Sequence, residues 1–155
     1  MRRVVSAAVS TAVALTIGAS FAIRAAAPDI RGAWQADTYI LKSGQRHPAK
    51  GLIVFTRSEW LVLFFVTPDG KTPQRGSAEG GSYTLANNAL VFTHLYNLSS
   101  GRAVEGLPES PLRMELHDAA DAPTEASRVE FTGDRMTIRF PSGNSLIFRQ
   151  SSRFE

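Results

Sequence analysis

The stretch of sequence that decides the fold runs from Ser127 to Arg149, SRVEFTGDRMTIRFPSGNSLIFR. Apolar and polar residues alternate in it over three short segments, as in strands with one buried face. The first two segments are separated by Gly133-Asp134, a pair typical of a tight hairpin turn, and the last two by Pro141-Ser142-Gly143-Asn144. The stretch therefore predicts a three-strand antiparallel meander, whose apolar face needs further sheet to cover it.

The sequence upstream of the meander supplies that sheet. Segments rich in branched and aromatic residues recur between turn signals, and no segment has the pattern of a soluble helix. The Gly-containing polar stretches 70–81 and 97–111 and the polar stretch 118–126 with Pro123 are predicted to be loops, and Asn87-Asn88 a tight turn. With the meander this gives nine strands, the first six over residues 34–41, 51–56, 60–66, 82–85, 90–96 and 112–117. The pattern is typical of an all-β antiparallel barrel or sandwich.

The N-terminal residues are interpreted as a targeting segment. Arg2-Arg3 precedes an uncharged run from Val4 to Ile23, and Ser20-Phe21-Ala22 offers the small residues read by a signal peptidase. We expect a signal peptide over 1–22, a linker over 23–31, the β-barrel domain over 32–150 and a tail over 151–155. The mature protein would be periplasmic or secreted, in a bacterium, and soluble without a membrane span. An uncleaved membrane anchor is the alternative.

Charge and cysteine content exclude some classes of function. The chain has 17 Lys and Arg against 14 Asp and Glu, and removing residues 1–22 leaves 15 − 14 = +1. A nearly neutral domain without a basic run gives no support for nucleic-acid binding. Because the chain has no cysteine, an exported domain would depend on its core rather than on disulfides.

Several segments resemble those of bacterial lipocalin-like domains, within the calycin group of up-and-down barrels. The resemblance rests on Gly32-Ala33-Trp34, on the strand from Gly51 to Thr56, on Gly81 to Leu85 before the Asn87-Asn88 turn, and on the run from Val129 to Ile138. It implies a barrel of eight to ten strands with a cavity open at one end. It also implies that Trp34 packs at the closed end against Arg149, where a guanidinium over an indole gains cation–π energy.

His94 is the titratable residue of most interest, because alternation places it on one strand face with Leu90, Phe92 and Tyr96. If that face points inward, His94 can orient a ligand or act as acid or base; the alternative is a histidine satisfied in the core or facing solvent. The predicted ligand-binding set is Leu90, Phe92, His94, Tyr96, Phe55 and Met114.

The sequence points to a binding protein more than to an enzyme. The three histidines lack the spacing of a metal site, and no nucleophile elbow or phosphate loop is present, so we predict no metal, cofactor or assigned catalytic residue. The expected partner is a small apolar or amphipathic ligand in the barrel. The alternatives are a small cyclase or isomerase on the same scaffold, and a filled barrel that serves as a structural or interaction module.

Overall fold

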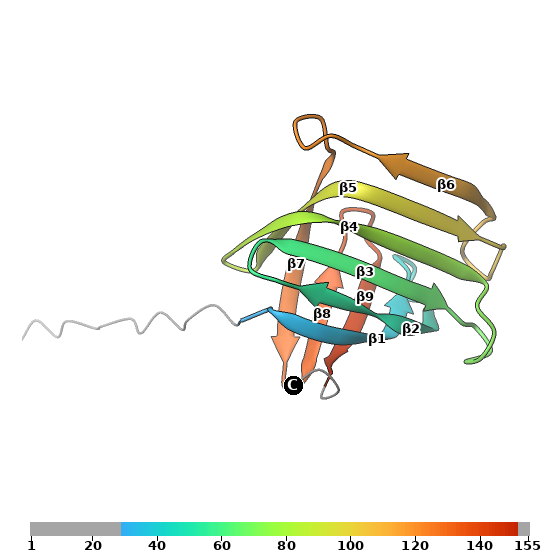
Figure 1. The fold of residues 1–155 in the computed structure, drawn as a ribbon. Helices are drawn as coiled ribbons and strands as arrows, with labels where there is room; N and C mark the ends of the chain where they lie inside the picture. The colour runs from blue at the N-terminus through green and yellow to red at the C-terminus, as the bar shows by residue number, and fades with distance from the viewer. Residues whose placement is uncertain (1–28, 152–155) are drawn as a thin grey trace, which may run out of the picture.

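The computed structural model describes residues 29–151, and within this range it contains nine strands and no helix (Figure 1). The predicted signal peptide, most of the linker and nearly all of the tail lie outside the described residues. Within residues 29–151 no helix has the length and apolar character needed to cross a bilayer. The strands are β1 (Gly32–Ile40), β2 (Arg46–Phe55), β3 (Glu59–Val66), β4 (Arg75–Ala86), β5 (Ala89–Gly101), β6 (Ser110–Leu116), β7 (Thr124–Thr132), β8 (Arg135–Arg139) and β9 (Ser145–Gln150).

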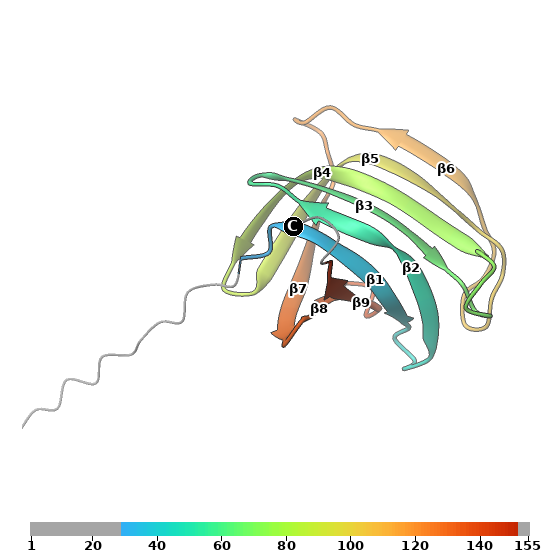
Figure 2. The ribbon, with the colours of Figure 1, turned by 60° about the horizontal axis from the view of Figure 1, so that its bottom comes forward.

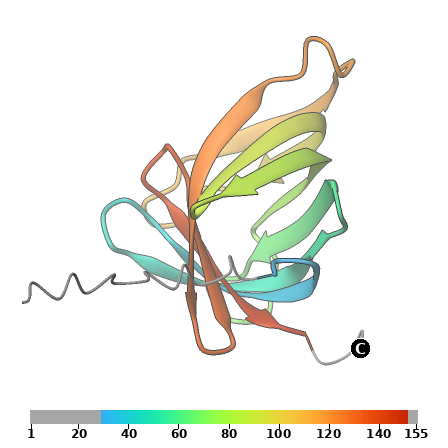
Figure 3. The same ribbon diagram turned by 90° about the vertical axis from the view of Figure 1, so that its left-hand side faces the viewer.

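Eight of the nine described strands close into a single antiparallel barrel. Each strand from β1 to β5 pairs with the next, β5 pairs with β7, and β7, β8 and β9 form the meander. The ring closes where β9 pairs with β1. Seen from the side in Figure 3, the orange and red strands β7–β9 stand at an angle to the green strands β3 and β4. The predicted all-β, up-and-down barrel is confirmed, with a strand number at the lower end of the expected range.

Strand β5 divides the sheet in two, and we call this point the fork at Leu95. Ala89 to Thr93 pair with β7, whereas Tyr96 to Gly101 pair with β6, which lies outside the ring. Figure 2 shows β6 beyond β5 at the edge of the sheet. On the β4 side, Gly80 pairs with Tyr96 but Gly81 with His94, so Leu95 has no partner there and forms a β-bulge. The extra residue reverses which face the following side chains occupy.

The tight turns follow the sequence prediction. Asn87 and Asn88 have φ of 49° and 65° between the paired residues Ala86 and Ala89, as a two-residue hairpin turn requires. Gly133, with φ of 60°, begins the turn between β7 and β8. These turns fix the register, because a slip of one residue would move every apolar side chain to the other face.

The core fills most of the barrel. The apolar residues of the meander, Val129, Met136, Ile138, Leu146 and Phe148, are at most 1% exposed. They meet aromatic rings from the other side of the ring, where the centroids of Trp60 and Phe92 are 4.3 Å apart and those of Phe55 and Phe92 are 6.3 Å apart. The predicted dry face of the meander is therefore confirmed, and it is covered by β2, β3 and β5.

The closed end differs from the expectation drawn from lipocalins. Trp34 is buried, donates its indole Nε1–H to the carbonyl oxygen of Ile30 at 2.9 Å and packs on Phe131. Arg149 pairs in register with Gln35, not Trp34, so it projects from the opposite face of the sheet. There its Nε lies 3.1 Å from Oδ1 of Asp37. The predicted Trp34–Arg149 contact is wrong, because neighbouring positions along a strand alternate between faces.

Candidate functional site

An ion pair between a histidine and a carboxylate lies inside the barrel, next to the fork at Leu95. Nδ1 of His94 on β5 is 3.0 Å from Oε2 of Glu79 on β4, and their side chains are 17% and 26% exposed. His94 points inward because it follows buried Phe92 by two residues on β5. Glu79 points inward because its cross-strand neighbour is buried Val62. Two neighbouring strands thus place an acid and a base in hydrogen-bond contact.

A second carboxylate, Glu125 on β7, faces the same space. It pairs across the strands with Phe92, which fixes its side chain on the inner face. The hydroxyl of Ser127 donates to Oε1 of Glu125 at 3.1 Å, and the hydroxyl of Ser77 donates to Oε1 of Glu79. Three strands that meet at the fork therefore contribute one imidazole and two carboxyl groups.

The surroundings shift the pKa values of these groups in different directions. The hydrogen bond to Glu79 raises the pKa of His94 above its usual value, against a smaller lowering by burial. Burial raises the pKa of Glu79, but the hydrogen bonds from His94 and Ser77 outweigh it and leave the pKa below its usual value. Burial raises the pKa of Glu125, and the nearby charge of Glu79 adds to the rise. The site favours an ionised Glu79, a protonated His94 and a proton held on Glu125 to higher pH than usual.

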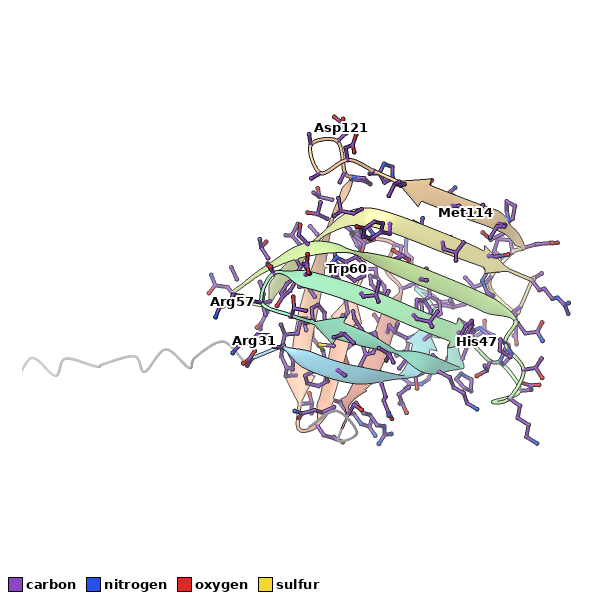
Figure 4. The ribbon with its side chains drawn as sticks, viewed as in Figure 1. Arg31, His47, Arg57, Trp60, Met114 and Asp121 are labelled. Atoms are coloured by element: carbon purple, nitrogen blue, oxygen red, sulfur yellow. The ribbon has the colours of Figure 1, made fainter. Side chains whose placement is uncertain are left out.

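These groups line a small inner cavity of about 40 Å³, between the polar residues of the site and the aromatic core. Trp60, Phe92, Phe140 and Phe148 form much of its wall, and the ring centroids of Trp60 and His94 are 5.2 Å apart. Figure 4 labels Trp60 at the start of β3. The indole Nε1–H of Trp60 is buried, and no residue between 29 and 151 accepts a hydrogen bond from it. A cavity of this size accepts a water molecule or a group as small as an ammonium. The indole N–H can donate to a water there, but not to an ammonium, which has no acceptor.

A second, more polar cavity of about 220 Å³ adjoins the first, since Phe64 and Glu79 line both. Its other walls include Tyr39, Ser77, Ser99 and Ser110. Together the two cavities provide an apolar pocket with an ion pair at the junction and hydroxyl groups beyond it.

Residues 102–109, which join β5 to β6, form a strap at the side of the polar cavity. Nε2 of buried His47 lies 2.9 Å from the carbonyl oxygen of Glu105, and Nη1 of Arg75 donates to the carbonyl oxygen of Arg102 at 2.9 Å. Leu107 of the strap lines the polar cavity. Figure 4 labels His47, which comes from β2 and so ties the strap to the opposite part of the ring. The strap is thereby held against the barrel from two sides.

The predicted ligand-binding residues divide into three groups. Phe92 and His94 line the inner cavity. Leu90 and Phe55 are buried in the core and line neither cavity. Tyr96 and Met114 are 53% and 72% exposed on the outer face. The prediction for these last two is wrong, because it assumed unbroken alternation along β5 and an inward-facing β6, whereas the bulge at Leu95 turns the outer part of β5, and β6 with it, the other way.

Sequence reasoning missed Glu79 and Glu125, because both lie in segments that were assigned to loops. β4 begins at Arg75 and β7 at Thr124, so each residue belongs to a strand. The one signal that could have revealed Glu79 is the Asn87-Asn88 hairpin. Extending the strand before this turn back past Gly81 places Glu79 on β4, next to β5.

Comparison with known proteins gives no relative from which to infer the activity. No protein-family model, curated protein or solved structure matches the chain. Only the barrel and the geometry of its interior therefore indicate the function.

Proposed function

We propose that the protein is a lipocalin-like binding protein that takes a small amphipathic ligand into the open part of its barrel. The observation that carries the proposal is the His94–Glu79 pair at the junction of an apolar and a polar cavity. Such a combination, mostly apolar walls with a few convergent polar groups, is the usual form of a small-molecule site. The eight-strand barrel is also of the size that holds one small ligand.

The chemistry of the site restricts the ligand. Glu79 and Glu125 accept hydrogen bonds, so the polar end of the ligand carries a donor, preferably a cationic one such as an amine. The inner cavity admits a group no larger than one or two heavy atoms, and the rest of the ligand occupies the polar cavity beside Tyr39 and Leu107. This supports a short-chain amine or a similar small amphipathic molecule rather than a bulky lipid.

The test is a calorimetric titration of the protein with n-alkylamines from butylamine to octylamine, after mass spectrometry of whatever copurifies with it. We expect Glu79→Gln to weaken amine binding by about 1–3 kcal/mol, as for loss of a hydrogen bond to a charged group. His94→Phe keeps a ring of similar size but removes the imidazolium that competes with an ammonium for Glu79, so it is expected to act in the opposite direction. Glu130→Gln is the matched control, because Glu130 forms an exposed ion pair with Arg139.

Two results would contradict the proposal. If no amine binds and nothing copurifies, the barrel acts as a filled module. If amines bind equally well to wild type and to Glu79→Gln, the ligand head does not lie at the ion pair.

Acid–base catalysis is the second candidate function, and one specific observation favours it. A base oriented by a carboxylate, His94 with Glu79, shares its space with Glu125, whose raised pKa suits a proton donor. Isomerisation by proton transfer needs such a pair. Incubation of a copurified compound in D₂O distinguishes the two functions: incorporation of carbon-bound deuterium that His94→Phe abolishes supports catalysis, and an unchanged compound supports binding.

Export of the protein is also part of the proposal. It is supported by the Arg2-Arg3 pair and the uncharged run that follows. N-terminal sequencing of the exported chain is expected to begin at or near Ile23, and intact Met1 in a membrane fraction would favour an anchor instead.

A further inference from the structure

The outer face of strands β3 to β6 is unusually apolar. Positions that pair across the strands share one face, so three rows of side chains run over this surface. In the middle row Leu63 pairs with Ala78, Ala78 with Leu98, and Leu98 with Met114. We call this surface the outer apolar face; its large side chains are Leu61, Leu63 and Phe65 on β3, Tyr96 and Leu98 on β5, and Leu112, Met114 and Leu116 on β6. Figure 4 labels Met114 on β6.

The exposed area of this face is large for a monomer. Its eight large side chains are between 36% and 78% exposed. They leave on the order of 800 Å² of contiguous surface in contact with water, more than the roughly 300–600 Å² that is usual for the largest patch on a monomeric protein. The same area is what one partner contributes to a stable interface of standard size, about 800 Å².

The face has hollows on both sides of its middle row. On β4 the row positions hold only Gly76, Ala78 and Gly80, and the side chains of Phe65 and Leu61 on β3 lie over the two glycines. A hollow of about 480 Å³ lies at the Gly76 end, between Phe65 and Ser100. Tyr96 lies at the Gly80 end of the face. Along β5, Tyr96 and Ser100 lie two residues to either side of Leu98 in the middle row. A second hollow, of about 450 Å³, lies at the Gly80 end between Leu61 and Tyr96.

Charges of both signs flank the face, with exposed Arg57 before β3 at the same end as Glu59 and exposed Glu109 before β6 at the same end as Arg102. Exposed Lys50 lies beside Phe65, and exposed Arg102 follows the end of β5. At the other end, exposed Glu59 precedes Leu61 and exposed Asp118 follows the end of β6. Two copies placed face to face with their strands running in opposite directions would bring Lys50 and Arg102 of each copy toward Glu59 and Asp118 of the other.

We propose that the outer apolar face is the interface of a homodimer, in which two copies pack face to face about a two-fold axis along the Leu63–Ala78–Leu98–Met114 row. An axis in this position makes the contact isologous, so the same surface serves on both copies. It places Tyr96 of each copy over Ser100 and Gly76 of the other, where the hollow lies. The inner cavity of the candidate site stays outside this interface, whereas the polar cavity shares Gly76 and Ser100 with the hollow.

The test is analytical ultracentrifugation of the full chain over a concentration range from 1 to 100 µM, in about 0.15 M salt. Wild type is expected to be dimeric within this range. Leu63→Lys places a charge in the middle row, and Ser100→Trp fills the hollow; each is expected to raise the dissociation constant at least about tenfold. Thr84→Lys, an exposed position on β4 outside the face, is the matched control and is expected to leave the constant unchanged.

A double-mutant comparison tests the arrangement of the two copies. Tyr96→Ala and Ser100→Trp remove the same contact, so the double variant is expected to be no weaker as a dimer than the poorer single variant. Circular dichroism and thermal unfolding establish that each variant is folded. If one variant does not fold, the other still tests the face, because the two substitutions lie on opposite sides of the middle row.

Three results would overturn the proposal. One is a wild-type chain that stays monomeric at 100 µM. Another is a dimer whose dissociation constant is the same in Leu63→Lys, Ser100→Trp and Thr84→Lys, which would assign the contact to another part of the chain. The third is a monomer that binds vesicles of phosphatidylcholine and phosphatidylglycerol and loses this binding in Leu63→Lys, which would assign the face to a lipid surface.

Discussion

The ion pair inside the barrel predicts a pH-dependent contribution to stability that a double-mutant cycle can isolate. The variants are Glu79→Gln, His94→Gln and the combination of the two, each of which removes a charge while keeping a polar side chain of similar size. The coupling energy between the two positions is the quantity of interest, because it cancels the effects of each substitution on its own surroundings.

The magnitude follows from the geometry and exposure of the pair. A hydrogen bond to a charged group contributes about 1.5–3 kcal/mol. Exposed ion pairs contribute about 0–1 kcal/mol. The 3.0 Å contact between partly covered side chains belongs between these limits, so we expect a coupling of about 1–1.5 kcal/mol at its maximum.

The sign of the pH dependence follows from the two pKa shifts. His94 has a raised pKa, so its contribution is complete below its unfolded value of 6.5 and is lost as the pH rises through the folded value. Glu79 has a lowered pKa, so its contribution is complete above its unfolded value of 4.5 and is lost as the pH falls through the folded value. The coupling is therefore expected to be largest between pH 4.5 and 6.5.

Urea unfolding followed by circular dichroism at pH 5.5 and at pH 9 measures the cycle. The coupling is expected to fall by more than half at pH 9, where only a neutral imidazole remains to donate. The exposed pair of Arg139 and Glu130 is the control, with no histidine and hence no expected change between the two pH values. A coupling at pH 5.5 that is indistinguishable from zero, or that is equal at both pH values, would refute the reasoning.

Three further predictions concern stability. Glu125→Gln is expected to stabilise the fold at pH 8 but not at pH 4, because the raised pKa of Glu125 means that its ionised form is unfavourable in the folded state. The gain in unfolding free energy is expected to stay below about 1 kcal/mol, because solvent screens this partly exposed group. A gain at pH 4 would contradict the assignment. Gly81→Ala is expected to cost about 1–3 kcal/mol or more in urea unfolding, because a Cβ there would lie 2.0 Å from the carbonyl oxygen of Thr93; an unchanged midpoint would exclude this close approach. Trp34→Ala is expected to lower the free energy of unfolding by about 3–5 kcal/mol in the same measurement, because Trp34 is buried. Arg149→Ala is expected to lower it much less, because the Arg149–Asp37 pair is partly exposed. Equal losses for the two variants would favour the contact between Trp34 and Arg149 that was expected from the sequence.

Much of the barrel could be predicted from the sequence, because alternation and turn chemistry act locally. The Asn87-Asn88 and Gly133 turns each need a positive φ that few residues adopt, and they lie between alternating segments. Val129, Met136, Ile138, Leu146 and Phe148 of the meander are buried as expected, whereas Phe131 and Phe140 are partly buried. In these segments local preference and the final fold agree, which is the condition under which sequence reasoning succeeds.

The first half of β4 could not be predicted, because its strand structure depends on neighbours rather than on its own residues. Gly76 and Gly80 have little preference for strands, yet both pair with β3. A Cβ at Gly76 would lie 2.9 Å from Cδ1 of Phe65, and one at Gly80 would lie 2.9 Å from Cδ1 of Leu61. The large side chains of β3 thus cover the glycines of β4, and only the paired strands contain this information.

Only part of the candidate site could be predicted, because two of its residues lie in strands that form only by pairing with their neighbours. His94 was recognised from the alternation of β5, which holds up to the bulge. Its partner Glu79 belongs to the glycine-rich half of β4, and Glu125 to a polar segment that becomes strand only by pairing with β5. The bulge at Leu95 has no signature in the sequence, so the outward position of Tyr96 could not be foreseen.

The fork at Leu95 also separates the molecule into parts that can open independently. β6 is held in the sheet only by the second half of β5, whereas β8 is paired on both sides within the closed ring. Backbone amides of β6 can therefore exchange their hydrogens through a local opening that leaves the ring intact, while those of β8 must wait for the ring to break. In a hydrogen-exchange experiment the backbone amides should fall into two classes with different exchange rates. The boundary between the two classes is expected at Leu95, next to His94 of the candidate site.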